Sequence, residues 1–132
     1  MSAGRARHGR RSAGACIAAL LISAAGCSHG EADAAALTHG GSAARGKLLI
    51  DAYGCGSCHT IPRVRGATAT VGPNLTGIAS RDYIAGVLPN TPENMMRWIR
   101  NPQGIDDKTA MPTLGVSESD ARHIAAYLYT LK

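Results

Sequence analysis

Two cysteines and a histidine stand together near the middle of the chain, in the run CGSCH at residues 55–59. The spacing C-x-x-C-H is the signature of covalent haem attachment. One turn of chain sets both sulfurs along one edge of the porphyrin, where they add to its vinyl groups, while the next residue turns beneath the iron. The sequence therefore predicts that Cys55 and Cys58 hold a haem and that His59 is an iron ligand.

Two other kinds of cysteine site fit part of this motif. A thioredoxin-like C-x-x-C pair is expected beside a strand and a helix of a βαβ unit, and no strand-like pattern precedes Cys55. A structural zinc site needs four ligands, and no second Cys or His pair stands at finger spacing. The motif as a whole therefore favours haem over a redox disulfide or zinc.

An iron that carries electrons without binding small molecules needs a sixth ligand, and a thioether is a soft, neutral one that raises the reduction potential. Met95 and Met96 fall inside a predicted helix, where packing explains a methionine. Met111 stands in the loop KTAMP at residues 108–112, far enough along the chain to cross the opposite face of the ring. We expect Met111 to be the ligand and His123, on the last predicted helix, to have a surface or packing role.

Two helices near the ends of the folded part must position these residues. The first carries an apolar stripe at i, i+3, i+4 and i+7, formed by Gly46, Leu49, Ile50 and Tyr53, and Gly54 offers a stop. The second starts at a capping-box-like Ser117-x-x-Asp120 and continues with the apolar face Ile124, Tyr127, Leu128 and Leu131. The matching stripes predict that the two helices pack together, with Gly46 allowing a close crossing.

A third helix is predicted from Pro92 to Arg100, with Thr91 as its cap, Pro92 at the first helical position and Asn101-Pro102 as its end. Residues 54–90 are punctuated by Gly and Pro, and no run among them alternates convincingly as a strand. We therefore expect an all-α domain with long loops, which would pack poorly unless the loops wrap something.

The composition also indicates a core that protein alone fills poorly. Hydrophobic residues make up 45% of the 132 residues, but aromatic residues only 4%, with one Trp, four Tyr and no Phe. Large rings contribute much of the buried area in a domain of this size, and marginal domains need a staple. A covalently bound haem would supply the missing aromatic core.

The first 26 residues have the layout of a bacterial export signal. Four arginines precede a short apolar stretch at residues 13–26, and that stretch is shorter than the ~18 residues that span a bilayer. The run Ala24-Ala25-Gly26-Cys27 resembles the lipobox of bacterial lipoproteins, with Ala24 where that family usually has Leu. We expect residues 1–26 to be removed and Cys27 to carry lipid, which would place the protein on the periplasmic side of a bacterial membrane.

Removal of the signal leaves ten Lys or Arg against nine Asp or Glu, so most of the formal net charge of +5 belongs to the targeting segment. Because no basic stripe remains, nucleic acid is not an expected partner. Residues 28–42 are small and polar, and we expect residues 27–42 to be a lipid-attachment Cys and a flexible tether with an end-to-end distance of roughly 20 Å. His29 and His39 in it are expected to be solvated, and the domain itself to span residues 43–132.

Four separated elements of residues 43–132 resemble class I cytochromes c. They are the CGSCH motif, Gly72-Pro73-Asn74-Leu75, the Met111-Pro112 loop and the final helix with Tyr127. The resemblance implies a class I fold of three to four helices around one covalently bound haem c, with His59 and Met111 as axial ligands. It also implies that the Pro73 carbonyl accepts a hydrogen bond from the second nitrogen of His59, which fixes the tautomer of a ligating imidazole and raises its basicity.

A narrower similarity concerns residues 71–103, which look like the cytochrome c domain fused to subunit II of some haem-copper oxidases. The copper-binding part of that subunit does not precede the domain here, so we expect a free-standing relative. The expected function is that of a monomeric electron carrier, not an enzyme, between a quinol-oxidising complex and a terminal oxidase. The alternative is an electron-accepting subunit of a periplasmic dehydrogenase or of an oxidase complex. Trp98, Arg97 and Arg100 are candidate partners for the haem propionates.

Overall fold

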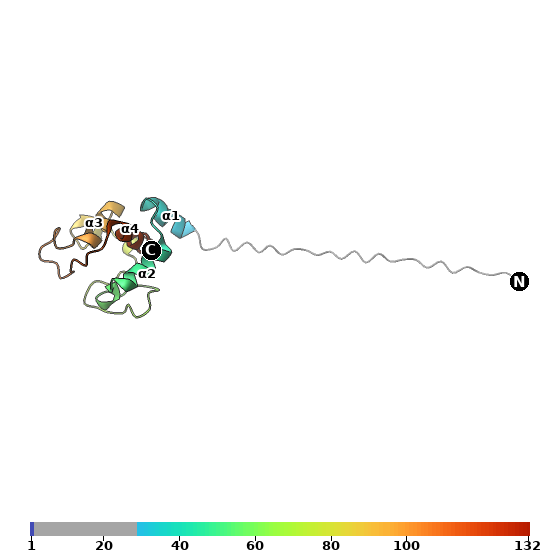
Figure 1. Ribbon diagram of the computed structural model, residues 1–132, viewed down its shortest axis with the longest axis horizontal. Coiled ribbons are helices and arrows are strands. Elements are labelled where there is room, and N and C mark those ends of the chain that lie inside the picture. The colour runs from blue at the N-terminus through green and yellow to red at the C-terminus, as the bar shows by residue number, and fades with distance from the viewer. Residues whose placement is uncertain (2–28) are drawn as a thin grey trace.

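A computed structural model of the protein describes Met1 and residues 29–132, and it shows four α-helices with long connections (Figure 1). The elements in chain order are α1 (His29–Leu37), α2 (Ala43–Ala52), the 3₁₀ turns η1 (Cys55–Ser57) and η2 (Ile78–Ser80), the strands β1 (Tyr83–Ile84) and β2 (Leu88–Pro89), α3 (Pro92–Arg100) and α4 (Glu118–Leu128). The all-α class expected from the sequence is confirmed.

Helices α2 and α4 cross at close range, as the matching stripes predict. Gly46 of α2 lies directly against the backbone of α4, where a Cβ atom would overlap the carbonyl of His123 and lie 3.0 Å from Cβ of Tyr127. Tyr53, which follows α2, donates a hydrogen bond of 2.9 Å to Asp120 in the first turn of α4. This bond lowers the pKa of the Asp120 carboxyl. The two helices therefore form a direct protein-on-protein contact.

Helix α3 has the predicted bounds and the predicted caps. The Thr91 hydroxyl accepts a hydrogen bond from the Asn94 amide at 3.2 Å, and Pro92 occupies the first turn. Met95, Trp98 and Ile99 are buried and face the core. At the start of α4, the Ser117 hydroxyl accepts a hydrogen bond from the Asp120 amide at 3.1 Å, as its capping-box-like sequence predicts.

The region between η2 and α3 contains a short hairpin that the sequence analysis did not predict. Tyr83 pairs with Pro89 and Ile84 with Leu88 in antiparallel register. The chain reverses through Ala85 and Gly86, which both have positive φ. Two-residue strands are too short to show alternation, so periodicity had no signal to detect here.

Helix α1 corrects the expectation of a flexible tether over residues 27–42. Within the described part of that segment, His29–Leu37 is helical, and Ala34 and Thr38 are 1% and 0% exposed. The helix packs on α4 and α2. The physical reason is that short side chains, which give no visible apolar face, still permit helix formation and close approach to a neighbouring helix.

The expected signal over residues 1–26 and the expected lipid on Cys27 lie outside the described residues, apart from Met1. Among the helices that are described, none is long and apolar enough to span a membrane.

Candidate haem site

The CGSCH segment directly follows α2 and turns sharply. Gly54 has φ of 69°, which favours glycine, and η1 then begins at Cys55. The amides of Cys58 and His59 both donate to the carbonyl of Cys55, at 3.2 and 3.1 Å. One tight turn therefore holds both thiols and the imidazole together, and both cysteines are free thiols and partly buried.

The His59 ring is fixed from one side by residues 72 and 73. Its Nδ1 lies 2.7 Å from the Pro73 carbonyl, which only accepts, so Nδ1 carries the proton. Gly72 lies against the ring, where a Cβ atom would come within 2.5 Å of Cε1, and the Gly72 amide donates to the Cys58 carbonyl at 2.7 Å. The imidazole is therefore held in one orientation, and its Nε2 is left with a lone pair for a ligand.

Burial raises the pKa of the Cys55 thiol. A redox-active C-x-x-C pair works through a thiolate of lowered pKa, so the shift at Cys55 has the wrong direction for that chemistry. A helix, not a strand, precedes the motif. The residues that the structure describes also contain no group of three or more His, Cys, Asp or Glu side chains arranged to hold a metal ion. Neither alternative to haem gains support.

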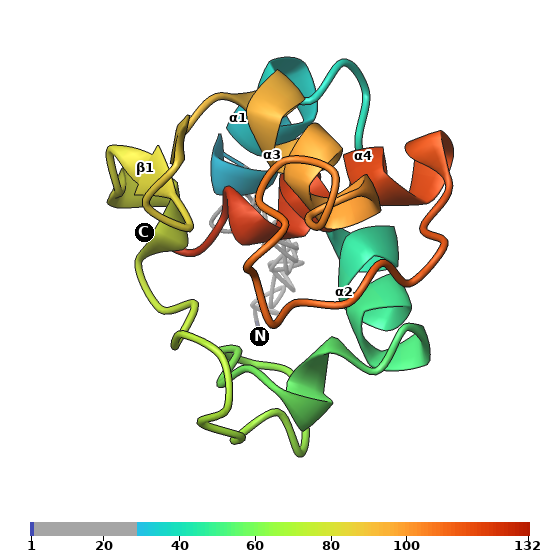
Figure 2. The same cartoon turned by 90° about the vertical axis from the view of Figure 1, so that its left-hand side faces the viewer.

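The three candidate methionines occupy different environments. Met95 is 2% exposed within the core cluster, whereas Met96 and Met111 are partly buried and pack against that cluster. Met111 lies in the connection between α3 and α4, and its amide donates to the Thr109 hydroxyl at 3.3 Å. Figure 2 shows this connection crossing the middle of the view, with the 54–75 segment below it. The structure thus leaves Met96 and Met111 as accessible thioethers.

The three residues suggested for the propionates are divided. Trp98 is buried in the core. Arg97 donates to Asn94 at 3.0 Å, and Arg100 forms an ion pair with Glu118 at 3.5 Å. Both arginines line an open surface cavity of about 410 Å³ whose other lining residues are Asn101, Gly104, Ile105 and Val116. That lining includes neither His59 nor Met111, so a propionate role for the arginines stays a prediction.

Tyrosine hydroxyls at the end of α4 fasten the loops, and sequence reasoning did not identify them. Tyr127 donates to the Pro62 carbonyl at 2.6 Å. Tyr129 donates to Asn90 at 2.8 Å, and the amide group of Asn90 donates to the carbonyls of Ile78 and Arg81, also at 2.8 Å. Burial raises the pKa of Tyr129 to about 12. The aromatic character of this helix was the only available signal.

The residues at this site fit a covalently attached haem. Two free thiols and an oriented imidazole come from one turn, and Met111 offers a partly exposed thioether. The long connections also contribute apolar side chains that pack against the core without being fully buried, namely Leu75, Leu88 and Ile105. Half-covered apolar surface of this kind suits contact with a flat, apolar ring.

Comparisons with known proteins address the same part of the chain. The family model described as Cytochrome c matches residues 43–132. Cytochrome c oxidase subunit 2 of Alkalihalophilus pseudofirmus is 37% identical over 90 residues, which cover 67% of this chain and 25% of the relative. The subunit 2 of Bacillus subtilis strain 168 is 32% identical over 96 residues, covering 68% and 26%. The chain spans about a quarter of the length of these curated relatives. No solved structure matches it significantly.

Proposed function

The chain belongs to the cytochrome c family, and from this premise we propose that it is a single-haem electron carrier attached to the periplasmic side of a bacterial membrane. Membership confirms the resemblance drawn from the motifs and implies a covalently bound haem c and electron transfer. The bound group supplies one-electron chemistry at its iron. The number of haems, the ligands, the partners and the location belong to the proposal.

The proposed attachment residues are Cys55 and Cys58, and the proposed iron ligands are His59 and Met111. The observation that carries the proposal is the His59 ring, which is fixed by the Pro73 carbonyl at 2.7 Å from Nδ1, in the same turn of chain as the two thiols. A hydrogen bond at the far nitrogen of a ligating imidazole sets its tautomer and raises its basicity.

An iron whose six coordination positions are all occupied can transfer electrons but cannot bind a substrate. A peroxidase needs an open coordination position and distal acid-base residues, and a Met111 thioether would occupy that position. Methionine ligation and burial in a low dielectric both favour the reduced state, so the proposed potential is positive. We propose electrons enter from a quinol-oxidising complex and leave to a terminal oxidase.

The proposed location rests on the amino-terminal sequence. Removal of residues 1–26 and lipid on Cys27 would confine the domain near membrane-bound donors and acceptors and raise their effective concentration. A Cys27→Ser protein is expected in the soluble fraction. Recovery of this variant on membranes would contradict the lipid anchor.

A second candidate is a permanent cytochrome subunit of an oxidase complex. The similarity to subunit 2 chains of cytochrome c oxidases favours it. Co-purification from detergent-solubilised membranes distinguishes the two: a carrier separates from the oxidase at moderate salt, whereas a subunit migrates with it at constant stoichiometry.

The ligand set is tested by absorption of the purified, haem-loaded protein. Met111→Ala should abolish the weak far-red charge-transfer band of methionine-to-ferric-iron ligation. Met96→Ala is the matched control, because Met96 is also partly buried against the core but lies on α3. A far-red band that survives in Met111→Ala and disappears in Met96→Ala would reassign the ligand. A colourless protein would overturn the proposal.

A further inference from the structure

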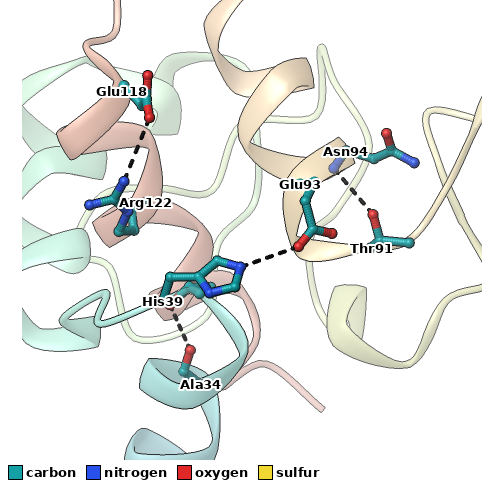
Figure 3. A network of polar contacts seen from close by, with 8 residues as sticks. Ala34, His39, Thr91, Glu93, Asn94, Glu118 and Arg122 are labelled. Carbon is teal, nitrogen blue, oxygen red and sulfur yellow. Dashed lines mark hydrogen bonds and ion pairs between the residues drawn. The ribbon is translucent and has the colours of Figure 1, made fainter.

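Residues 29–42, which we name the N-terminal strap, are fastened to the domain at several independent points. Ala34 and Thr38 are almost completely buried. The Ser42 amide donates to His123 Nδ1 on α4 at 2.9 Å. Figure 3 shows His39 reaching Glu93 at the start of α3, with an Nε2 to Oε1 distance of 3.4 Å. Two helices of the domain therefore hold the strap.

Gly41 is tightly enclosed, because the atom nearest to a Cβ added there is Oγ1 of Thr38 in the strap itself, and the next two belong to α4. A Cβ atom at this position would lie 2.6 Å from the carbonyl oxygen of Arg122 and 2.8 Å from Cβ of Ala126. Only glycine allows the strap backbone to lie this close to α4. The strap also lies outside residues 43–132, the part that matches the family model.

The docked strap fixes where the chain leaves the domain. Helix α1 starts at His29, two residues after Cys27 in the sequence. Figure 1 shows the start of α1 at one side of the molecule and the connection between α3 and α4 at the opposite side. Figure 2, viewed from the side of that connection, shows it crossing the middle of the view, with the 54–75 segment below it and α1 above.

We propose that the N-terminal strap is a rigid spacer which orients the domain on a lipid surface and turns the haem-site loops away from the bilayer. The proposal rests on the proposed function for the attachment at Cys27. A domain of this size is about 30 Å across. The electron-transfer partner is therefore a redox protein whose centre stands well clear of the bilayer in an extramembrane domain, not one embedded at the membrane surface.

The test attaches the haem-loaded chain, beginning at Cys27, through that thiol to maleimide lipids in phosphatidylcholine vesicles. Reduction is followed by absorption with two ferrocene reductants, one soluble and one carried on a lipid headgroup. We compare the wild-type chain with a chain that has the four residues Gly-Ser-Gly-Ser inserted between Ser28 and His29. The insertion should speed reduction by the lipid-borne reductant at least about tenfold, because the tether then lets the site approach the bilayer, and should leave the soluble reaction unchanged.

A second pair of variants tests the docking itself. Gly41→Ala should lift the strap from α4, speed the lipid-borne reaction as the insertion does and increase hydrogen exchange over residues 31–40. Gly30→Ala is the matched control, because a Cβ atom at Gly30 meets nothing within 4 Å. It should change neither measurement.

Two results would overturn the proposal. One is a lipid-borne reaction as fast in the wild-type chain as in the chain with the insertion. The other is exchange over residues 31–40 in the wild-type chain at the rate of an unstructured peptide. Native lipidation is read separately, by incorporation of labelled palmitate in cells. Absence of the label would contradict the lipid anchor in the proposed function. The reduction rates and the hydrogen exchange would still test the spacer, because the attachment to vesicles is chemical.

Discussion

Helix α4 meets two kinds of neighbour, and the contrast shows which part of the fold the protein makes by itself. Against α2 it packs backbone to backbone, where Gly46 meets the carbonyl of His123. Against the 54–90 loops it makes hydrogen bonds from the tips of Tyr127 and Tyr129. The helix crossing is closed and self-contained, whereas the loops keep apolar side chains such as Leu75 and Leu88 only partly covered. We therefore expect the loops, but not the helix crossing, to depend on a bound haem for their order.

Removing the attachment residues should break this contrast most severely. In a Cys55→Ala, Cys58→Ala double variant, we expect no covalent haem and loss of hydrogen-exchange protection over residues 60–90 by at least about 100-fold, because those segments open first when their apolar contacts are missing. Residues 43–52 and 118–128 should retain more protection than the loops. Equal loss in both regions would show that the helix crossing needs the haem as much as the loops do.

Gly46→Val changes the crossing of α2 and α4. The new side chain would overlap the α4 backbone at His123, and we expect about 3 kcal/mol of lost unfolding free energy, from overpacking in a closed helix contact. Guanidinium unfolding of the haem-loaded protein measures it. Lys47→Ala, at an exposed neighbouring position, should stay within about 0.5 kcal/mol of wild type. A Gly46→Val protein as stable as that control would contradict the close crossing.

Much of the helical part could be predicted because its signals are local. Thr91 and Pro92 mark the start of α3, and Ser117 marks the start of α4, by chemistry that acts within one turn. The α1 docking could not be predicted, because Ala34 and Thr38 give no amphipathic stripe and their burial depends on Gly41 meeting α4. The hairpin was missed because its strands have two residues each.

The candidate site divides in the same way. Cys55, Cys58 and His59 are recognisable from spacing alone, and the structure places them in one turn. The contact of Pro73 with His59 came only from the family resemblance, since 14 residues separate the two. The Asn90 link to Tyr129 has no sequence signature, because side-chain hydrogen bonds between distant loops depend on the completed fold.

Gly72→Ala tests the side of the site that fixes His59. The added methyl group would lie 2.5 Å from Cε1 and 2.8 Å from Nδ1 of the ring, so it should displace the imidazole and lengthen or break its bond to Pro73. We expect a shift in the visible spectrum and roughly 2 kcal/mol of lost stability, as for other forced displacements in packed sites. Val71→Ala, at an exposed neighbour, should leave the spectrum unchanged. An unaltered Gly72→Ala spectrum would contradict ring fixation by this loop.

Tyr127→Phe removes only one hydrogen bond between α4 and the loops, the one from the Tyr127 hydroxyl to the Pro62 carbonyl. Loss of the 2.6 Å hydrogen bond leaves the Pro62 carbonyl without this donor and should cost about 1 kcal/mol. Tyr83→Phe is the matched control, because Tyr83 is 59% exposed on the short hairpin. Its effect should be close to zero. If both variants unfold at the same denaturant concentration, the hydroxyl contact contributes nothing to loop attachment.

The buried hydroxyl of Tyr129 should make the protein less stable at alkaline pH. Burial raises the pKa of Tyr129 to about 12 from its ordinary value near 10. Because the folded state holds the phenol proton more tightly, the associated stability is fully present below pH 10 and declines as the pH rises toward 12. Unfolding midpoints measured across this interval should therefore fall more for wild type than for Tyr129→Phe, which has no proton to lose. The Tyr83→Phe protein keeps Tyr129 and should follow the wild-type curve. If the unfolding midpoint of wild type changed with pH no more than that of Tyr129→Phe, the Tyr129 hydroxyl would be open to water. In that case only the Tyr127 hydrogen bond would remain as a buried contact between the end of α4 and the loops.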